Sequence, residues 1–228
     1  MKKSFNQDLL KLFALFAMVV DHVGEIFFPD TVLGFWMRAT IGRTVFPIFA
    51  FLVVVHLFQK GCYEKYLKRL GLFAFFSQFI LFPFIGVKLN IFFSLFLFVF
   101  LFFCFKKARK RAFSLNQLIL TDIIIWTGCA CLSFYCPYEI YGLLFMTGLY
   151  SYLETKQRRF LFFTLFCAFL MNWIPGENIL FGVSSTLTTV CLLSFCWSGR
   201  RFLKRWYLFY AFYPIHLFFL YLLKATLS

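Results

Sequence analysis

The sequence predicts an all-α integral membrane protein, a polytopic bundle of about nine transmembrane helices with a cytoplasmic N-terminus. Of the 228 residues, 62% are hydrophobic, whereas soluble domains have roughly 45–50% apolar residues. The apolar residues form long runs, and about 20 such residues are enough for a helix to cross the hydrocarbon core of a bilayer. Because these runs fill nearly the whole chain, residues 1–228 are predicted to form a single transmembrane domain.

Each predicted span is an apolar run between clusters of charged or polar residues. The sixth and seventh are short, which leaves open a tilted or partly re-entrant course. In chain order the nine spans are Leu9–Phe28, Gly42–Gln59, Leu70–Val87, Leu89–Phe105, Leu115–Tyr135, Pro137–Leu153, Phe160–Trp173, Ile179–Trp197 and Trp206–Leu223.

The basic residues predict the orientation, because cytoplasmic loops of membrane proteins are enriched in Lys and Arg. All of the 23 basic residues except Arg38, Arg43, Lys88 and Lys224 lie at the N-terminus or in every second connection. This alternation predicts a multi-pass protein of the cytoplasmic (inner) membrane, with the C-terminus outside. The net charge of +14 is confined to short connections without a continuous basic face, so no nucleic-acid partner is predicted. The eight Cys and three His lack metal-ligand spacing, and no metal site is expected.

Asp21, His22 and Glu25 lie inside the first span, where ionisable side chains are costly and usually functional. On a helix, Glu25 is one turn from both other residues, whereas adjacent residues do not face each other. We therefore expect Glu25, rather than Asp21, to orient His22 and hold its tautomer. His22 is the candidate general base, since imidazole titrates near neutral pH. The alternative is a structural network in which Arg43 neutralises a carboxylate.

The predicted orientation places polar residues of other spans at the same outer depth. Arg43 opens the second span after Gly42, where the positive end of a helix would favour an anion such as Asp21 or a substrate carboxylate. Snorkelling of Arg43 to the outer interface is the alternative. Asn90 and Glu139 open the fourth and sixth spans from outside, where simple solvation would also account for them.

His216 lies in the outer half of the ninth span and follows Tyr213-Pro214. Pro214 removes a backbone donor and bends a helix, so it is expected to aim His216 toward the interior of the bundle. A packed histidine without a chemical role remains the alternative.

Several stretches together resemble the TraX family of integral-membrane pilin N-acetylases: LKLFALFAMVVDHVGEIFFP, IGRTVFPIFAFL, LNIFFSLFLF and the closing FYAFYPIHLF. That family is similar to multi-pass acyltransferases that use a histidine in their first helix. The resemblance covers residues 9–105 and the C-terminal stretch. Asp21 and His22 match the family's DH pair, Arg43 its GR, Asn90 its LN and His216 its YPxHL. Glu139 stands where Asp is expected before Tyr-Gly, and VVVHLFQKG after FAFL departs from the family pattern.

The resemblance implies transfer of an acetyl group from cytoplasmic acetyl-CoA to an extracytoplasmic acceptor, the N-terminal amine of processed conjugative pilin. The catalytic residues would be His22, Asp21 and Arg43, with Arg43 either polarising the thioester oxygen or anchoring Asp21. Substrate binding would then involve Glu25, Asn90, Glu139 and His216. The acetyl group could cross on a threaded pantetheine arm or through an acetyl-histidine relay.

Two other classes of function remain open. A proton-coupled transporter or exporter would use Asp21, Glu25 and His216 as a relay. Transporters commonly contain internal repeats, but no later span repeats the Asp-His pair of the first. A structural membrane scaffold would not require charged side chains from several spans at one depth.

Overall fold

The computed structural model describes residues 4–85, 88–111, 113–173, 178–198 and 207–227. Helices account for nearly all of its regular structure, and each predicted span overlaps a helix. The helices are α1 (Gln7–Phe27), α2 (Val32–Trp36), the π-helix η1 (Met37–Ile41), the 3-10 helix η2 (Gly42–Thr44), α3 (Val45–Lys60), α4 (Tyr63–Ile85), α5 (Ile91–Ala108), α6 (Leu115–Ser133), α7 (Glu139–Thr155), α8 (Arg158–Leu170), α9 (Leu180–Ser194) and α10 (Tyr207–Leu227).

Two three-residue strands are the exception to this helical structure. β1 (Ser4–Asn6) pairs in parallel with β2 (Cys196–Ser198) and thereby joins the start of α1 to the end of α9. The Asn6 side chain then caps α1 by accepting a 2.8 Å hydrogen bond from the Asp8 backbone N–H.

Four helical segments in the described residues are long and apolar enough to cross a bilayer: Val32–Lys60, Ile91–Ala108, Leu115–Ser133 and Tyr207–Leu227. The predicted class, a helical membrane protein, is thus confirmed. α1 is also long, but it contains four charged residues, and α4 has four charged residues in its first two turns. α7, α8 and α9 have 17, 13 and 15 residues.

The second predicted span begins ten residues earlier than expected, and its start at Gly42 was wrong. Helical structure is continuous from Val32 to Lys60, with the π-helix and the 3-10 helix in its middle. The N-cap is Thr31, whose hydroxyl accepts a 3.0 Å hydrogen bond from the Gly34 backbone N–H. Gly42 keeps helical backbone angles (φ −58, ψ −45), so it does not end a helix.

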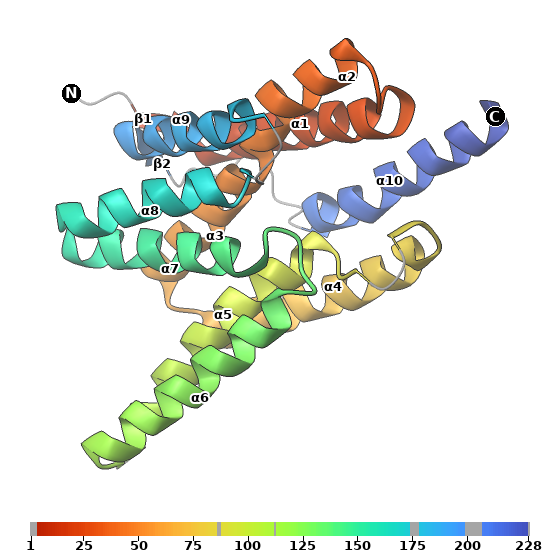
Figure 1. The fold of residues 1–228 in the computed structure, drawn as a ribbon. Helices are drawn as coiled ribbons and strands as arrows, with labels where there is room; N and C mark the ends of the chain where they lie inside the picture. The colour runs from red at the N-terminus through yellow and green to blue at the C-terminus, as the bar shows by residue number, and fades with distance from the viewer. Residues whose placement is uncertain (1–3, 86–87, 112, 174–177, 199–206, 228) are drawn as a thin grey trace.

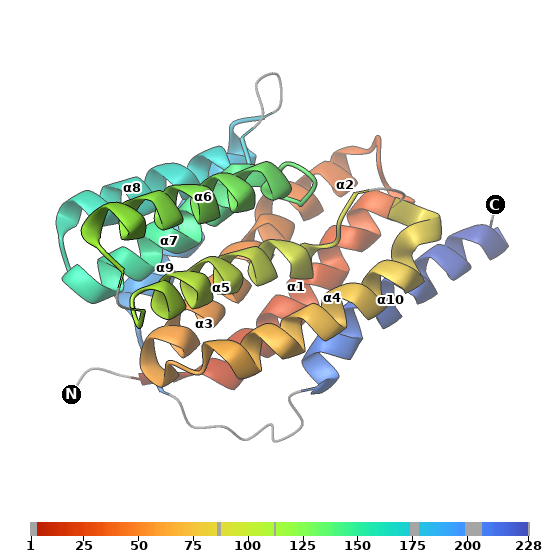
Figure 2. The ribbon, with the colours of Figure 1, turned by 90° about the horizontal axis from the view of Figure 1, so that it is seen from below.

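The helices enclose one hydrophobic core, with Phe46, Phe98 and Phe145 completely buried at its centre. α1 packs antiparallel to the long segment from α2 to α3 and also contacts α10, while α4 packs between α5 and α10. α7, α8 and α9 pack in succession (Figure 1). Both views show the end of α10 projecting beyond its neighbours (Figure 2). The site described next lies where α1, the η1–η2 turns and α10 meet.

Candidate active site

A pair of histidines from opposite ends of the chain joins α1 to α10. His22 Nδ1 lies 2.8 Å from His216 Nε2, and the two rings are stacked with centroids 5.0 Å apart and planes inclined by 28°. His216 is 9% exposed. It follows Pro214, which lies within α10, so the expectation that His216 points into the bundle is confirmed.

The hydrogen bonds of the pair define which ring nitrogens carry protons. His216 Nδ1 lies 2.8 Å from the Phe212 carbonyl oxygen, and a carbonyl can only accept, so Nδ1 of His216 carries the proton. A neutral His216 then offers a lone pair at Nε2, to which His22 Nδ1 donates. His22 Nε2 is left unprotonated and is the nitrogen able to accept a proton from a substrate.

Aromatic side chains of α10 pack against the pair. The Phe212 ring stacks on His216 at 4.9 Å, inclined by 14°, and the Tyr213 ring centroid lies 6.2 Å from that of His22. Both residues precede His216 on α10 by about one helical turn. Hydrogen bonds are stronger in such surroundings than in water, so the tautomers of the pair are well defined.

No hydrogen bond of the described residues joins Glu25 to His22, so the expectation that Glu25 orients His22 was wrong, whereas substrate binding by Glu25 stays a prediction. Its side chain is exposed and lies 4.0 Å from Arg38 Nη2, and the hydrogen-bond partner of His22 Nδ1 is His216. The pairing was missed because one-turn spacing on α1 favours Glu25 as the partner of His22 and cannot identify a partner on another helix.

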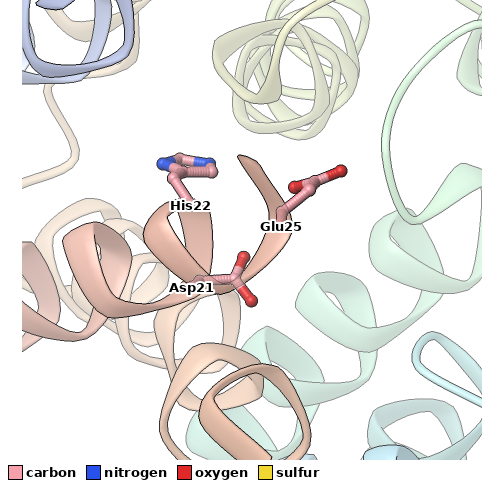
Figure 3. A group of neighbouring side chains, drawn as sticks. All are labelled: Asp21, His22 and Glu25. Atoms are coloured by element: carbon pink, nitrogen blue, oxygen red, sulfur yellow. The ribbon is translucent and has the colours of Figure 1, made fainter. Parts of the chain in front are cut away.

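Asp21 leaves α1 in a different direction from His22 (Figure 3). Its side chain lies directly against the backbone of Gly42 in η2, where an added β-carbon would be 2.0 Å from Asp21 Oδ1. Gly42 is therefore needed for the close approach of α1 to the α2–α3 segment. The expectation that Asp21 does not orient His22 agrees with the hydrogen bonds of the described residues.

Two arginines face Asp21 from the η1 and η2 turns. Arg43 interacts electrostatically with Asp21 and Tyr138, and its guanidinium lies 4.6 Å from the centre of the Phe181 ring. Because Arg43 is in the middle of a continuous helical segment, the expected effect of a helix N-terminus on it was wrong. Arg38 interacts with both Asp21 and His22. Sequence reasoning missed Arg38, and its only signal was a basic residue on the predicted outer side.

Asp21, Arg38 and Arg43 form a group that we call the arginine cluster. Three of its polar atoms are buried without a hydrogen-bond partner among the described residues: Asp21 Oδ1, Arg38 Nε and Arg43 Nε. Buried unsatisfied polar atoms are uncommon in proteins. The π-helix η1, which contains Arg38 and directly precedes the 3-10 helix of Arg43, is also a rare element that occurs frequently at functional sites. The cluster is therefore suited to binding a polar ligand beside His22.

One ligand atom each of Asp21, His22 and Glu25 lies within 4.8 Å of the others (Figure 3), a spacing that a cation could bridge. Arg38 and Arg43 add two positive charges next to these residues, and they oppose the binding of a cation. The geometry accordingly favours an anionic or polar ligand over a metal ion.

Asn90 and Glu139 are placed less centrally. Asn90 is 1% exposed and caps α5: its side-chain oxygen accepts from the Phe92 backbone N–H, and its amide donates to the Ala74 carbonyl. These contacts give Asn90 a structural role. Glu139 is exposed at the start of α7, next to Tyr138, which interacts with Arg43 of the arginine cluster. Substrate binding by Asn90 and Glu139 stays a prediction.

Comparison with known proteins identifies the family of this chain. The family described as "TraX protein" matches residues 6–224. The chain belongs to the TraX family. It is also 27% identical over 238 residues to the probable fimbrial assembly protein FimC, serogroup H1, of Dichelobacter nodosus, with 93% of each chain covered. No solved structure matches. The resemblance drawn from the Asp21-His22, Gly42-Arg43 and His216 stretches is thus confirmed for the family, over nearly the whole chain.

Proposed function

We propose that this TraX-family chain is a membrane-bound acetyltransferase that transfers an acetyl group from cytoplasmic acetyl-CoA to the N-terminal amine of processed pilin. The observation that carries the proposal is the hydrogen bond between His22 and His216, which leaves His22 Nε2 as a base. A pilin as acceptor is supported by the family and by the name of the fimbrial assembly relative.

In the proposed reaction the free amine of the acceptor attacks the thioester carbonyl. A C–N bond forms as the C–S bond breaks, His22 Nε2 takes a proton from the attacking nitrogen, and that proton passes to the departing thiolate of CoA. The imidazolium that forms on His22 still donates through Nδ1 to His216 Nε2, so the pair stays intact. Arg43 would anchor Asp21, and Arg38, close to both Asp21 and His22, would contribute a charge for the developing oxyanion.

The same proposal includes nine membrane crossings with the N-terminus in the cytoplasm. Under this arrangement the histidine pair lies toward the outer side, where a pilin N-terminus is released, whereas acetyl-CoA arrives from the cytoplasm. Support comes from the placement of basic residues between α3 and α4, α5 and α6, α7 and α8, and α9 and α10.

Intact-mass analysis of a co-expressed pilin tests the activity. With the wild-type chain, we expect the mass to increase by one acetyl group located at the N-terminus. With His22→Ala the increase should be absent, although the variant inserts into the membrane in normal amount. An unmodified pilin with the wild-type chain would contradict the proposal, and full acetylation by His22→Ala would remove His22 from the mechanism.

The proton-coupled transporter remains the alternative, but the geometry favours it less. Its relay requires Asp21, Glu25 and His216 to exchange protons. In the described residues no hydrogen bond joins either carboxylate to His216, whose ring nitrogens contact His22 and Phe212. Proton flux in vesicles reconstituted without acetyl-CoA would support the transporter.

A further inference from the structure

A cavity of about 370 Å³ lies between α1, α3, α4, α5 and α10, away from the arginine cluster. Its charged lining residues are Lys11 in the second turn of α1 and Arg69 near the start of α4. Both lie toward the ends of their helices that the basic connections place in the cytoplasm. The positive charges of the cavity therefore lie toward the side of the protein where a soluble cytoplasmic donor would arrive.

The lining of the cavity combines positive charge with aromatic rings. None of its lining residues is acidic, and besides Lys11 and Arg69 it includes His56, whose ring is stacked on Tyr66 at 5.1 Å. The buried Asp8 lies behind Lys11, with 2.6 Å between Lys11 Nζ and Asp8 Oδ1, and fixes the position of the ammonium group. Lysine and arginine bind phosphate oxygens, and aromatic faces stack on nucleotide bases.

A row of aromatic side chains connects the cavity with the histidine pair. Tyr210 and Phe92 both line the cavity, and their ring centroids are 5.7 Å apart. The Phe92 ring lies 5.3 Å from that of Tyr213, and Tyr213 lies 6.2 Å from His22. At 1.5 Å per helical residue, Lys11 precedes His22 by about 16 Å along α1. A phosphate held at the mouth of the cavity is thus within reach of His22 for a donor with an extended arm.

We propose that this cavity binds the phosphate-bearing part of the acyl-CoA donor, with Arg69 and Lys11 contacting its phosphates and its arm directed past Phe92 and Tyr210 toward His22. This inference rests on the proposed acetyltransferase function. It assigns the donor route to residues outside the histidine pair and the arginine cluster, and it favours a threaded arm over an acetyl-histidine relay.

A second basic pocket provides a matched control. It is lined by Lys65, Lys106, Lys107 and Lys110 near the α3–α4 connection, and it includes Glu64. Lys106 lies over the Tyr63 ring at 4.3 Å. If positive charge alone selected the donor, this pocket would bind it at least as well as the cavity, which contains only two cationic residues.

The test is equilibrium binding of CoA to the purified full-length chain in phosphatidylcholine nanodiscs. Arg69→Gln removes one phosphate contact and is expected to weaken binding at least tenfold, because a charge-assisted hydrogen bond is lost. Leu52→Trp, which places a bulky ring in the cavity, should weaken binding comparably. Lys110→Gln should leave binding unchanged, and His22→Ala should bind CoA normally while failing to acetylate pilin.

The outcomes separate this inference from the proposed function. Normal CoA binding by both Arg69→Gln and Leu52→Trp, or weakened binding by Lys110→Gln alone, would overturn the donor cavity. Loss of CoA binding when phosphatidylglycerol is added to the nanodiscs would assign the cavity to a lipid headgroup instead. If CoA binds as expected but pilin gains no acetyl group, the cavity stands and the pilin acceptor is wrong. Melting temperatures of all variants identify any that fail to fold.

Discussion

His22 Nδ1 and His216 Nε2 are 2.8 Å apart, although 194 residues separate them in the chain. Through this contact, α10 orients the candidate base His22 of α1. The Phe212 carbonyl of α10 in turn determines the tautomer of His216. In this arrangement His216 is a positioning residue, because it acts through His22 rather than on the substrate.

Replacing His216 tests this positioning role. His216→Ala removes the acceptor for His22 Nδ1, so the imidazole can rotate or change tautomer, and we expect acetyl transfer to fall on the order of 100-fold. His216→Gln retains an acceptor oxygen at about the depth of Nε2 and should recover part of the rate. The measurement is the initial rate of pilin acetylation, with kcat and KM determined separately.

The two His216 variants are compared with His22→Gln, which should be inactive because the amide nitrogen of glutamine is not basic and cannot accept the proton. The loss in His216→Ala should lie in kcat, with little change in KM for either substrate. Equal rates for His216→Ala and His216→Gln would show that the acceptor at this position has no role in the reaction.

Gly42→Ala is expected to separate α1 from the α2–α3 segment. The new β-carbon would be 2.0 Å from Asp21 Oδ1 and 2.6 Å from its Cγ, so one of the two backbones must shift. Strain of this kind typically costs about 1–3 kcal/mol, and thermal unfolding in detergent should show a clear fall in Tm together with a loss of activity.

Gly128→Ala is the control for that substitution. Gly128 lies within α6, and an added β-carbon would meet nothing within 4 Å. Since alanine has a higher helix propensity than glycine by about 1 kcal/mol, Gly128→Ala should retain or raise Tm. A Tm for Gly42→Ala equal to or above that of Gly128→Ala would contradict the close contact between Asp21 and Gly42.

Most of the fold follows from local sequence, because apolar runs between charged connections specify helices one at a time. The second span is the instructive exception. Gly42 resembled a helix start, whereas its lack of a β-carbon serves contact with Asp21 on another helix. A glycine can satisfy either requirement, and only the tertiary structure distinguishes them. The helical course of residues 32–41 was therefore missed, and with it the position of Arg43.

Most residues of the candidate site could be predicted from the sequence, but their contacts with one another could not. Asp21, His22 and His216 stand out because polar residues in apolar spans are costly. Their partners depend on which helices are neighbours, which no periodicity within one helix reveals. Glu25 was chosen from the i,i+3 rule, but His22 turns instead toward α10, while Arg38, unremarkable in sequence, lies beside Asp21 and Glu25.

Cysteine labelling tests the proposed orientation. Asp30 is exposed in the connection between α1 and α2, and Cys62 is exposed in the connection between α3 and α4. Each cysteine is tested alone, in a chain whose other cysteines are replaced by serine. In intact cells with a permeabilised outer membrane, a membrane-impermeant maleimide should label the cysteine introduced by Asp30→Cys and should not reach Cys62. Both should react after the inner membrane is disrupted. The reverse pattern would invert the orientation and place the histidine pair toward the cytoplasm.

Asp21→Asn isolates the charge of Asp21 from its shape. Asn is nearly isosteric, so packing against Gly42 is retained, but the negative charge facing Arg38 and Arg43 is lost. Leaving these partly buried guanidinium groups without that charge should lower the free energy of unfolding by about 1–3 kcal/mol. Arg43→Gln in the same chain should recover part of this loss, with a coupling of about 1 kcal/mol.

Asp122→Asn is the control for the loss of charge. Asp122 forms a 2.8 Å ion pair with Arg109, which is 55% exposed, and such surface pairs contribute about 0–1 kcal/mol to stability. Strictly additive effects of the Asp21 and Arg43 substitutions would show that Arg43 does not anchor Asp21, and Arg38 would then be its remaining cationic neighbour.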